Sequence, residues 1–159
     1  MKIRTGFGFD VHKLQEGYDF WIGGIKIPHI KGAVGHSDAD VLIHAICDAL
    51  LGAANLRDIG FHFPDTAAEY KGIDSKILLK RVNDLLTEKG YKIGNIDSTI
   101  CLQKPKINPF IPEMKKVMAQ ILSTEEENIS IKATTTENLG YVGREEGISA
   151  YATVLIEKE

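Results

Sequence analysis

The sequence lacks the long hydrophobic runs that membrane insertion and export require. It contains no stretch of about 18 or more consecutive apolar residues, and its first residues do not combine a basic region with an apolar one. Because both signals are missing, we expect a soluble protein that stays in the cytoplasm and has no membrane partner.

Cysteine is scarce, and charge of neither sign is concentrated. Cys47 and Cys101 have no CxxC spacing, which disfavours a disulfide framework and a thiolate zinc site. The formal charge of −3 comes from 26% charged residues without long blocks of one sign, so nucleic acid is not an expected partner. The 159 residues are 43% hydrophobic and contain no internal repeat. We therefore expect one domain, residues 1–159, that buries a sizeable core.

The most informative stretch of the chain is Gly35–Ala54. Ser37 is a favourable N-cap and Asp40 follows three residues later, so we expect a helix to begin at Ser37. Apolar residues form a stripe along one side of this helix. Asp40, His44 and Asp48 recur every fourth residue and therefore share another side, a pattern that suggests a metal site.

A carboxylate and an imidazole follow the first expected strand. The alternation over Lys2–Asp10 predicts a strand that ends with Asp10 and His12 on one side and Val11 toward the core. By itself this pair is more typical of a solvated turn, but His44 adds a third ligand. Two imidazoles and one carboxylate are typical of a catalytic or substrate-binding zinc, and they also suit non-haem iron.

The rest of the chain alternates strands and helices. We expect a hairpin at Tyr18–Pro28 and a loop at Asn55–Thr66. Helices are expected at Asp74–Lys89 and from Asn108 onward, and strands at Tyr91–Gln103, Asn128–Thr136 and Ile148–Glu157. This order predicts an α/β (α+β) fold: a two-layer sandwich of a mixed β-sheet with helices on one face, of the split βαβ or ferredoxin-like kind. The last strand is semi-apolar on both faces, which argues for association with other copies.

Two short segments are suited to phosphate groups. Lys104 and Lys106 flank a proline just before an expected helix N-terminus, where an anion is favoured. Thr134–Thr136 offer three hydroxyls, and Glu137 after them can bring a divalent cation to the same phosphates. Arg144, in the connector before the last strand, can reach an anion. Each feature also has an ordinary structural interpretation as a solvated turn, strand or connector.

Five segments together resemble the family of 2-C-methyl-D-erythritol 2,4-cyclodiphosphate synthases. They are FDVH (9–12), GHSDADVLIHAICDALLGA (35–53), DIGFHFPDT (58–66), KATTTE (132–137) and LGYVGREEGI (139–148). The resemblance covers nearly the whole chain in order. It implies a homotrimeric lyase of the non-mevalonate isoprenoid pathway, which converts 4-diphosphocytidyl-2-C-methyl-D-erythritol 2-phosphate into the cyclic diphosphate and CMP at active sites between subunits.

The resemblance also implies cofactors. Zinc is expected on Asp10, His12 and His44, and magnesium or manganese on Glu137. A prenyl diphosphate is a further ligand to consider for the central cavity of the trimer.

Site roles carry over from the resemblance position by position. His36 and Thr135 resemble the residues that stabilise the transition state, and Asp40 and Asp48 are expected to orient the zinc histidines from behind. The implied substrate-binding residues are Ser37, Asp58, Gly60, Phe63, Asp65, Lys104, Pro105, Lys106, Ile107, Asn108, Ala133, Thr134, Thr136, Tyr141 and Arg144.

Two other functions fit parts of the sequence. A 2-His-1-carboxylate iron oxygenase would use the same three ligands but would leave the KATTTE segment without a purpose. A non-catalytic trimeric binding module would use the apolar face of the last strand. The bound metal and the release of CMP discriminate between these alternatives and the cyclase.

Overall fold

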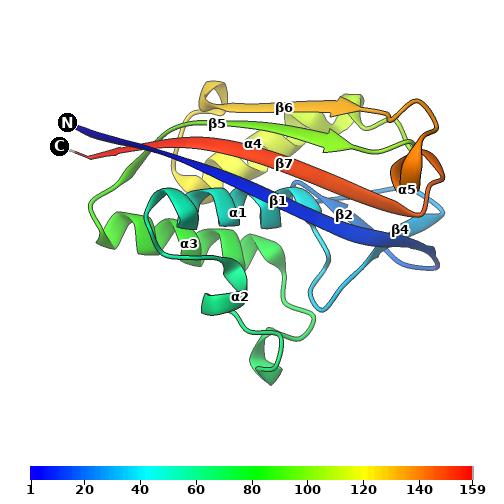
Figure 1. The fold of residues 1–159 in the computed structure, drawn as a ribbon, viewed down its shortest axis with the longest axis horizontal. Helices are drawn as coiled ribbons and strands as arrows, with labels where there is room; N and C mark the ends of the chain where they lie inside the picture. Colours follow the sequence, from blue (N-terminus) through cyan, green and yellow to red (C-terminus); the bar gives the residue numbers. More distant parts are fainter. Residues whose placement is uncertain (159) are drawn as a thin grey trace.

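A five-stranded mixed β-sheet is the frame of the molecule (Figure 1). The computed structural model describes residues 1–158, and the strand order is β4-β1-β7-β5-β6. The β5–β6 pair is parallel, and the other three neighbouring pairs are antiparallel. The bounds are Lys2–Glu16 for β1, Lys31–Val34 for β4, Lys92–Cys101 for β5, Ile129–Thr134 for β6 and Gly147–Lys158 for β7.

Three longer helices form the second layer. Helix α1 (Val41–Ala53) packs across β1 and β7, α4 (Ile111–Leu122) packs on β6, and α3 (Ser75–Glu88) packs against both of these helices. Short helical turns occur at α2 (Ile59–His62), η1 (Ala68–Tyr70), η2 (Asn108–Phe110), η3 (Glu126–Asn128) and α5 (Gly140–Gly143). Within residues 1–158 no helix combines the length and the apolar character that crossing a bilayer requires. The expected α/β sandwich of a mixed sheet and helices is confirmed.

Helix α1 lies unusually close to β1 because two glycines face it. A Cβ atom on Gly6 would stand 1.9 Å from the carbonyl oxygen of Ala49, and one on Gly8 would stand 1.9 Å from that of Ala45. No side chain fits at either position, so the helix backbone rests almost directly on the strand. The apolar side chains of α1 are nearly all fully buried in this arrangement.

Near the end of β1, the side chain that we expected in the core lies on the exposed face of the sheet. The strand continues to Glu16, and Val11 is 44% exposed on the sheet face away from α1, together with Phe7 and Phe9. Phe9 stacks at 5.1 Å between ring centroids on Tyr151 of β7. The prediction that Val11 faces the core was wrong, because the glycines and not the aromatic residues mark the face that meets the helix.

Helix α1 begins three residues later than a Ser37 N-cap would allow. Its N-cap is Asp40, whose carboxylate accepts a hydrogen bond from the backbone N–H of Ile43 at 3.0 Å. Ala39 has a left-handed backbone with φ of 57°, which a helix beginning at Ser37 could not contain. Ser37 therefore lies in the preceding loop, where its hydroxyl accepts from the N–H of Ala39.

The predicted hairpin is confirmed as β2 (Phe20–Ile22) and β3 (Ile25–Ile27). Its turn residues, Gly23 and Gly24, both have positive φ, as a tight two-residue turn requires. Their N–H groups donate to the two carboxylate oxygens of Asp40 at 3.0 and 2.7 Å. One buried carboxylate therefore begins α1 and ties the hairpin to it.

The later elements follow the predicted pattern with shifted ends. Asp74 caps α3, and Gly90, with φ of 77°, follows its end. The helix expected from Asn108 opens with the short turn η2 before α4, and the loop expected at 55–66 contains α2. Element type was therefore predictable from periodicity where the exact ends were not.

We predict that Gly8→Ala destabilises the protein by about 2 kcal/mol or more, because the added methyl must push α1 away from β1. Thermal or urea unfolding measures the loss. Gly52→Ala is the matched control: it lies within α1 with no atom within 4 Å of its added Cβ, and should stabilise by about 0.5 kcal/mol through helix propensity. Equal stability of Gly8→Ala and the parent would contradict the close-packing account.

Candidate metal centre

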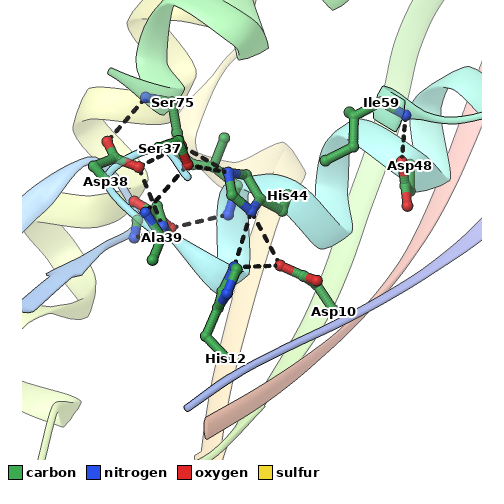
Figure 2. A network of polar contacts seen from close by, with 12 residues as sticks. Asp10, His12, Ser37, Asp38, Ala39, His44, Asp48, Ile59 and Ser75 are labelled. Atoms are coloured by element: carbon green, nitrogen blue, oxygen red, sulfur yellow. Dashed lines mark hydrogen bonds and ion pairs between the residues drawn. The ribbon is translucent and has the colours of Figure 1, made fainter. Parts of the chain in front are cut away.

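Three side chains from β1 and α1 converge on one point in Figure 2. Asp10 Oδ2 lies 2.9 Å from His12 Nε2 and 3.0 Å from His44 Nδ1, and the two imidazole nitrogens are 3.1 Å apart. Asp10 and His12 share the helix-facing side of β1, while His44 points down from α1 one turn after Asp40. The predicted grouping of these three residues, here called the triad, is confirmed.

The geometry of the triad fits a divalent transition-metal ion. Metal–ligand bonds of about 2.0–2.1 Å in a tetrahedral site separate neighbouring ligand atoms by about 3.3 Å, slightly more than the separations within the triad. Two imidazoles and one carboxylate are a common donor set for such ions. Three protein ligands leave a fourth position free for a substrate oxygen or water.

The charges of the triad are strongly coupled. Burial by itself would raise the pKa of Asp10, but hydrogen bonds and attraction from His12 and His44 outweigh it and lower this pKa to about 2. Burial by itself would lower the pKa of His44, yet the hydrogen bond and charge of Asp10 raise it above its ordinary value. Asp10 is therefore ionised at neutral pH, and His44 binds its proton more tightly than a free imidazole does, so that a metal ion competes with this proton.

The other ring nitrogen of His44 faces two serine hydroxyls. His44 Nε2 lies 2.9 Å from the Oγ of Ser75 and 3.2 Å from the Oγ of Ser37. The Ser75 hydroxyl in turn donates to Asp38 (Figure 2). Asp38 and Ser75 were missed in the sequence, because no periodicity links a loop residue to the first residue of a helix 37 positions later.

We expected Asp40 and Asp48 to orient the histidines, but their carboxylates form hydrogen bonds to backbone N–H groups instead. Asp40 caps α1 from outside the helix, so its carboxylate turns back to backbone N–H groups instead of following the side of His44. Asp48 accepts a hydrogen bond from the N–H of Ile59 at 2.8 Å. Burial is the main cause that raises the pKa of both carboxyl groups. Asp48 thus fastens the start of α2 to α1.

A cavity of about 460 Å³ opens beside the triad, and we call it the triad cavity. Five of the residues implied by the resemblance line it: His36, Ser37, Gly60, Phe63 and Asp65. Apart from the triad, its other lining residues are Val34, Gly35, Ile59, Tyr70, Ile73 and Leu78, none of which was among the predicted site residues. Asp58 is instead the N-cap of α2, accepting from the N–H of Phe61 at 2.9 Å.

A second cavity of about 220 Å³, the edge cavity, lies where β5 and β6 end. It is lined by Leu102, Gln103, Pro105, Lys106, Ile107, Asn108, Ala133, Thr134 and Thr135. The edge cavity shares no lining residue with the triad cavity, and β7 separates β1 from β5 in the sheet. The two halves of the predicted site are therefore apart within one chain.

The remaining predicted residues lie around the turn between β6 and β7. Lys104 forms an ion pair with Glu145 at 3.3 Å, and the Thr136 hydroxyl donates to the carbonyl of Leu139 at 2.7 Å. Glu137 is exposed, with a left-handed backbone. Tyr141 and Arg144 are also exposed, and Arg144 pairs with Glu146. None of these side chains reaches the triad cavity in the described part of the chain.

Comparison with known proteins finds similarity over the full length. A sequence model of the YgbB family matches residues 3–157. The chain is 67% identical over 159 residues to 2-C-methyl-D-erythritol 2,4-cyclodiphosphate synthase of Bacteroides thetaiotaomicron, covering 100% of both chains. It is similar to the IspF–CDP complex of Plasmodium falciparum, with a TM-score of 0.87, 34% identity and coverage of 99% and 97%. It also matches bifunctional IspDF of Campylobacter jejuni, with a TM-score of 0.95 and 41% identity, spanning 99% of this chain and 43% of that longer one.

We predict that metal binding at the triad strengthens as pH rises. The raised pKa of His44 means that a proton must leave before this ring can bind, whereas Asp10, with a pKa of about 2, is already ionised. Titration with Co²⁺, followed by visible absorbance at about pH 6 and about pH 8, measures the change. His44→Ala should abolish binding and His29→Ala, outside the triad, should not. An affinity that does not vary with pH would contradict the prediction.

Proposed function

Because this chain belongs to the YgbB family, we infer that it is a phosphorus–oxygen lyase of the non-mevalonate isoprenoid pathway. It converts 4-diphosphocytidyl-2-C-methyl-D-erythritol 2-phosphate into 2-C-methyl-D-erythritol 2,4-cyclodiphosphate and CMP. The observation that carries this conclusion is 67% identity to a named synthase over the whole of both chains. The triad, with an open cavity beside it, agrees with a metal-dependent activity.

The reaction is an intramolecular phosphoryl transfer. An oxygen of the 2-phosphate forms a bond to the β-phosphorus, and the bond from that phosphorus to the CMP oxygen breaks, so that CMP leaves with the electron pair. The nucleophile is already anionic, so no strong base is needed. The protein must bring the 2-phosphate and the diphosphate together and hold them in line. It therefore has to orient the two groups and neutralise their negative charge.

We propose that the triad holds zinc and that Glu137 holds magnesium or manganese. Imidazole and carboxylate donors support zinc, and an exposed carboxylate near phosphate-binding groups supports a hard cation that keeps several waters. When bound, the two ions would neutralise phosphate charge on either side of the transferred group.

The other proposed site residues bind the substrate. His36 and Ser37 border the triad cavity, where they can hold the 2-phosphate, and Asp65 and Phe63 can enclose the methylerythritol part. In the edge cavity, the backbone groups and the threonine hydroxyls suit a cytidine and its phosphates, and we place Thr135 beside the reacting phosphorus. Asp58, Gly60, Lys104, Thr136 and Arg144 complete the proposed contacts by resemblance.

We propose that the active site forms between copies of the chain in a homotrimer. A substrate that needs both cavities cannot be served by one chain if they stay apart, so the edge cavity of a second copy would complete the triad cavity of the first. The exposed apolar face of β1 and β7, with Phe7, Phe9, Val11 and Tyr151, supports this association. A prenyl diphosphate is the ligand that we propose for the central cavity, with Tyr141 near it.

Two smaller proposals concern the chain as a whole. We propose that residues 1–159 form one domain, which one family match over residues 3–157 supports. We also propose a cytoplasmic location, which the free cysteines Cys47 and Cys101 support, because free thiols suit a reducing compartment.

The purified protein, given the diphosphocytidyl substrate and Mg²⁺, should release CMP, and Glu137→Gln should lower the rate by about 100-fold or more while zinc stays bound. CMP release is followed by chromatography and zinc content by elemental analysis. Glu127→Gln, an exposed glutamate before β6, is the matched control and should keep full activity. Loss of zinc from Glu137→Gln would show that the proposed division between two metal sites is wrong.

The protein should sediment as a trimer, and Phe9→Asp should yield a folded monomer without activity. An added charge on the apolar face would be buried unpaired in the assembly, yet it is tolerated in the free chain, where Phe9 is 42% exposed. Sedimentation velocity measures the assembly. Tyr18→Asp, at an exposed position outside this face, should stay trimeric. A fully active monomer would refute the shared site.

A further inference from the structure

We infer that Asp38 and Ser75 are positioning residues that fix which nitrogen of His44 carries a proton, and so set the metal affinity of the triad. The inference rests on the metal site proposed above but not on the identity of the substrate. Neither residue belongs to the triad, and neither lines the triad cavity. They act on the far side of the His44 ring (Figure 2).

The direction of the hydrogen bonds follows from counting protons. The hydroxyl of Ser75 has one proton, and it is donated to Asp38, whose carboxylate can only accept. The same oxygen lies 2.9 Å from His44 Nε2, so it must accept there. The proton between Ser75 and His44 therefore belongs to Nε2.

In the metal-free protein Nδ1 also carries a proton, because it contacts the carboxylate of Asp10, which can only accept. A metal ion that replaces this proton leaves a neutral ring whose one proton stays on Nε2, so that Nδ1 offers its lone pair to the metal. Nδ1 is the atom of His44 that lies 3.0 Å from Asp10 and 3.1 Å from His12. The hydrogen bonds on one side of the ring thus present the ligand atom on the other side. Partners of this kind commonly orient metal-binding histidines and raise their basicity.

Asp38 is itself firmly held. Its carboxylate accepts from the N–H of Ser75 at 2.9 Å, from the hydroxyl of Ser75, and from the N–H of Asp40 at 3.2 Å. Ser75 is fully buried as the first residue of α3, where the helix dipole favours a negative group. Asp38 therefore joins the start of α3 to the start of α1, and the chain of contacts reaches the triad through rigid elements.

Ser37 also approaches Nε2, but it cannot replace Ser75. Its hydroxyl is 3.2 Å away, accepts from the N–H of Ala39, and is half-buried along the triad cavity. Nothing in its contacts requires the hydroxyl proton to point away from Nε2. Ser75, whose proton is committed to Asp38, is the residue that specifies the tautomer.

The test measures zinc affinity by competition with a chromogenic chelator. Ser75→Ala and Asp38→Asn should each raise the Kd for zinc by about 10- to 100-fold, the usual effect of removing such a partner. Ser98→Ala is the matched control, because Ser98 is an equally buried serine on β5 whose hydroxyl donates to the carbonyl of Ser130. It should lose stability to a similar extent and keep the Kd of the parent.

A second readout needs no substitution. In the zinc-loaded parent, long-range ¹H–¹⁵N correlation of the histidine rings should show His44 with a proton on Nε2 and the metal on Nδ1. A proton on Nδ1 would overturn the inference, as would a zinc Kd unchanged in both Ser75→Ala and Asp38→Asn. If the parent itself binds no zinc, the proposed metal centre fails; if the parent binds zinc but the variants match it, only the role of Asp38 and Ser75 fails.

Discussion

The close approach of α1 to β1 is the constraint on which the rest of the structure depends. Gly6 and Gly8 let the helix backbone rest on the strand, with no room for even a methyl group. At this distance the next residues on the same face of β1, Asp10 and His12, come within 3.1 Å of the ring of His44. A wider separation would leave the buried His44 and the partly buried Asp10 and His12 apart from one another, which is costly without compensating hydrogen bonds. The close approach of α1 to β1 is therefore required both for the packing of the core and for bringing the triad together.

The acidic residues near α1 serve different partners, although they are close in sequence. Asp38 accepts from the start of α3, Asp40 from the β2–β3 turn and the first turn of α1, and Asp48 from the start of α2. Each carboxylate satisfies backbone N–H groups that would otherwise be unpaired at an element end. The β2–β3 hairpin and the starts of α1, α2 and α3 are thereby fixed around the triad. This leaves Asp10 as the carboxylate that faces the metal position.

A cyclase of this type needs no strong general acid or base, and the groups found in the two cavities agree with this requirement. The triad cavity offers donors and a metal position, while the lysine and threonine groups lie at a different edge of the sheet. An intramolecular reaction between two phosphates gains most from orientation. The proposed trimer would supply this orientation by joining the two halves of the site, which lie at different edges of the sheet within one chain.

The sequence by itself determined the triad, the element types and the family resemblance. Asp10 and His12 are two apart on a strand, so local geometry was enough to pair them, whereas His44 was grouped with them by its ligand type and by the family resemblance. It did not determine the start of α1, the exposed side of Val11, or the partners of Asp40 and Asp48. Nor did it indicate Asp38 and Ser75. These features depend on contacts between residues far apart in the chain, such as Gly8 with Ala45 or Ser75 with His44, and only the packed tertiary structure decides which polar groups meet.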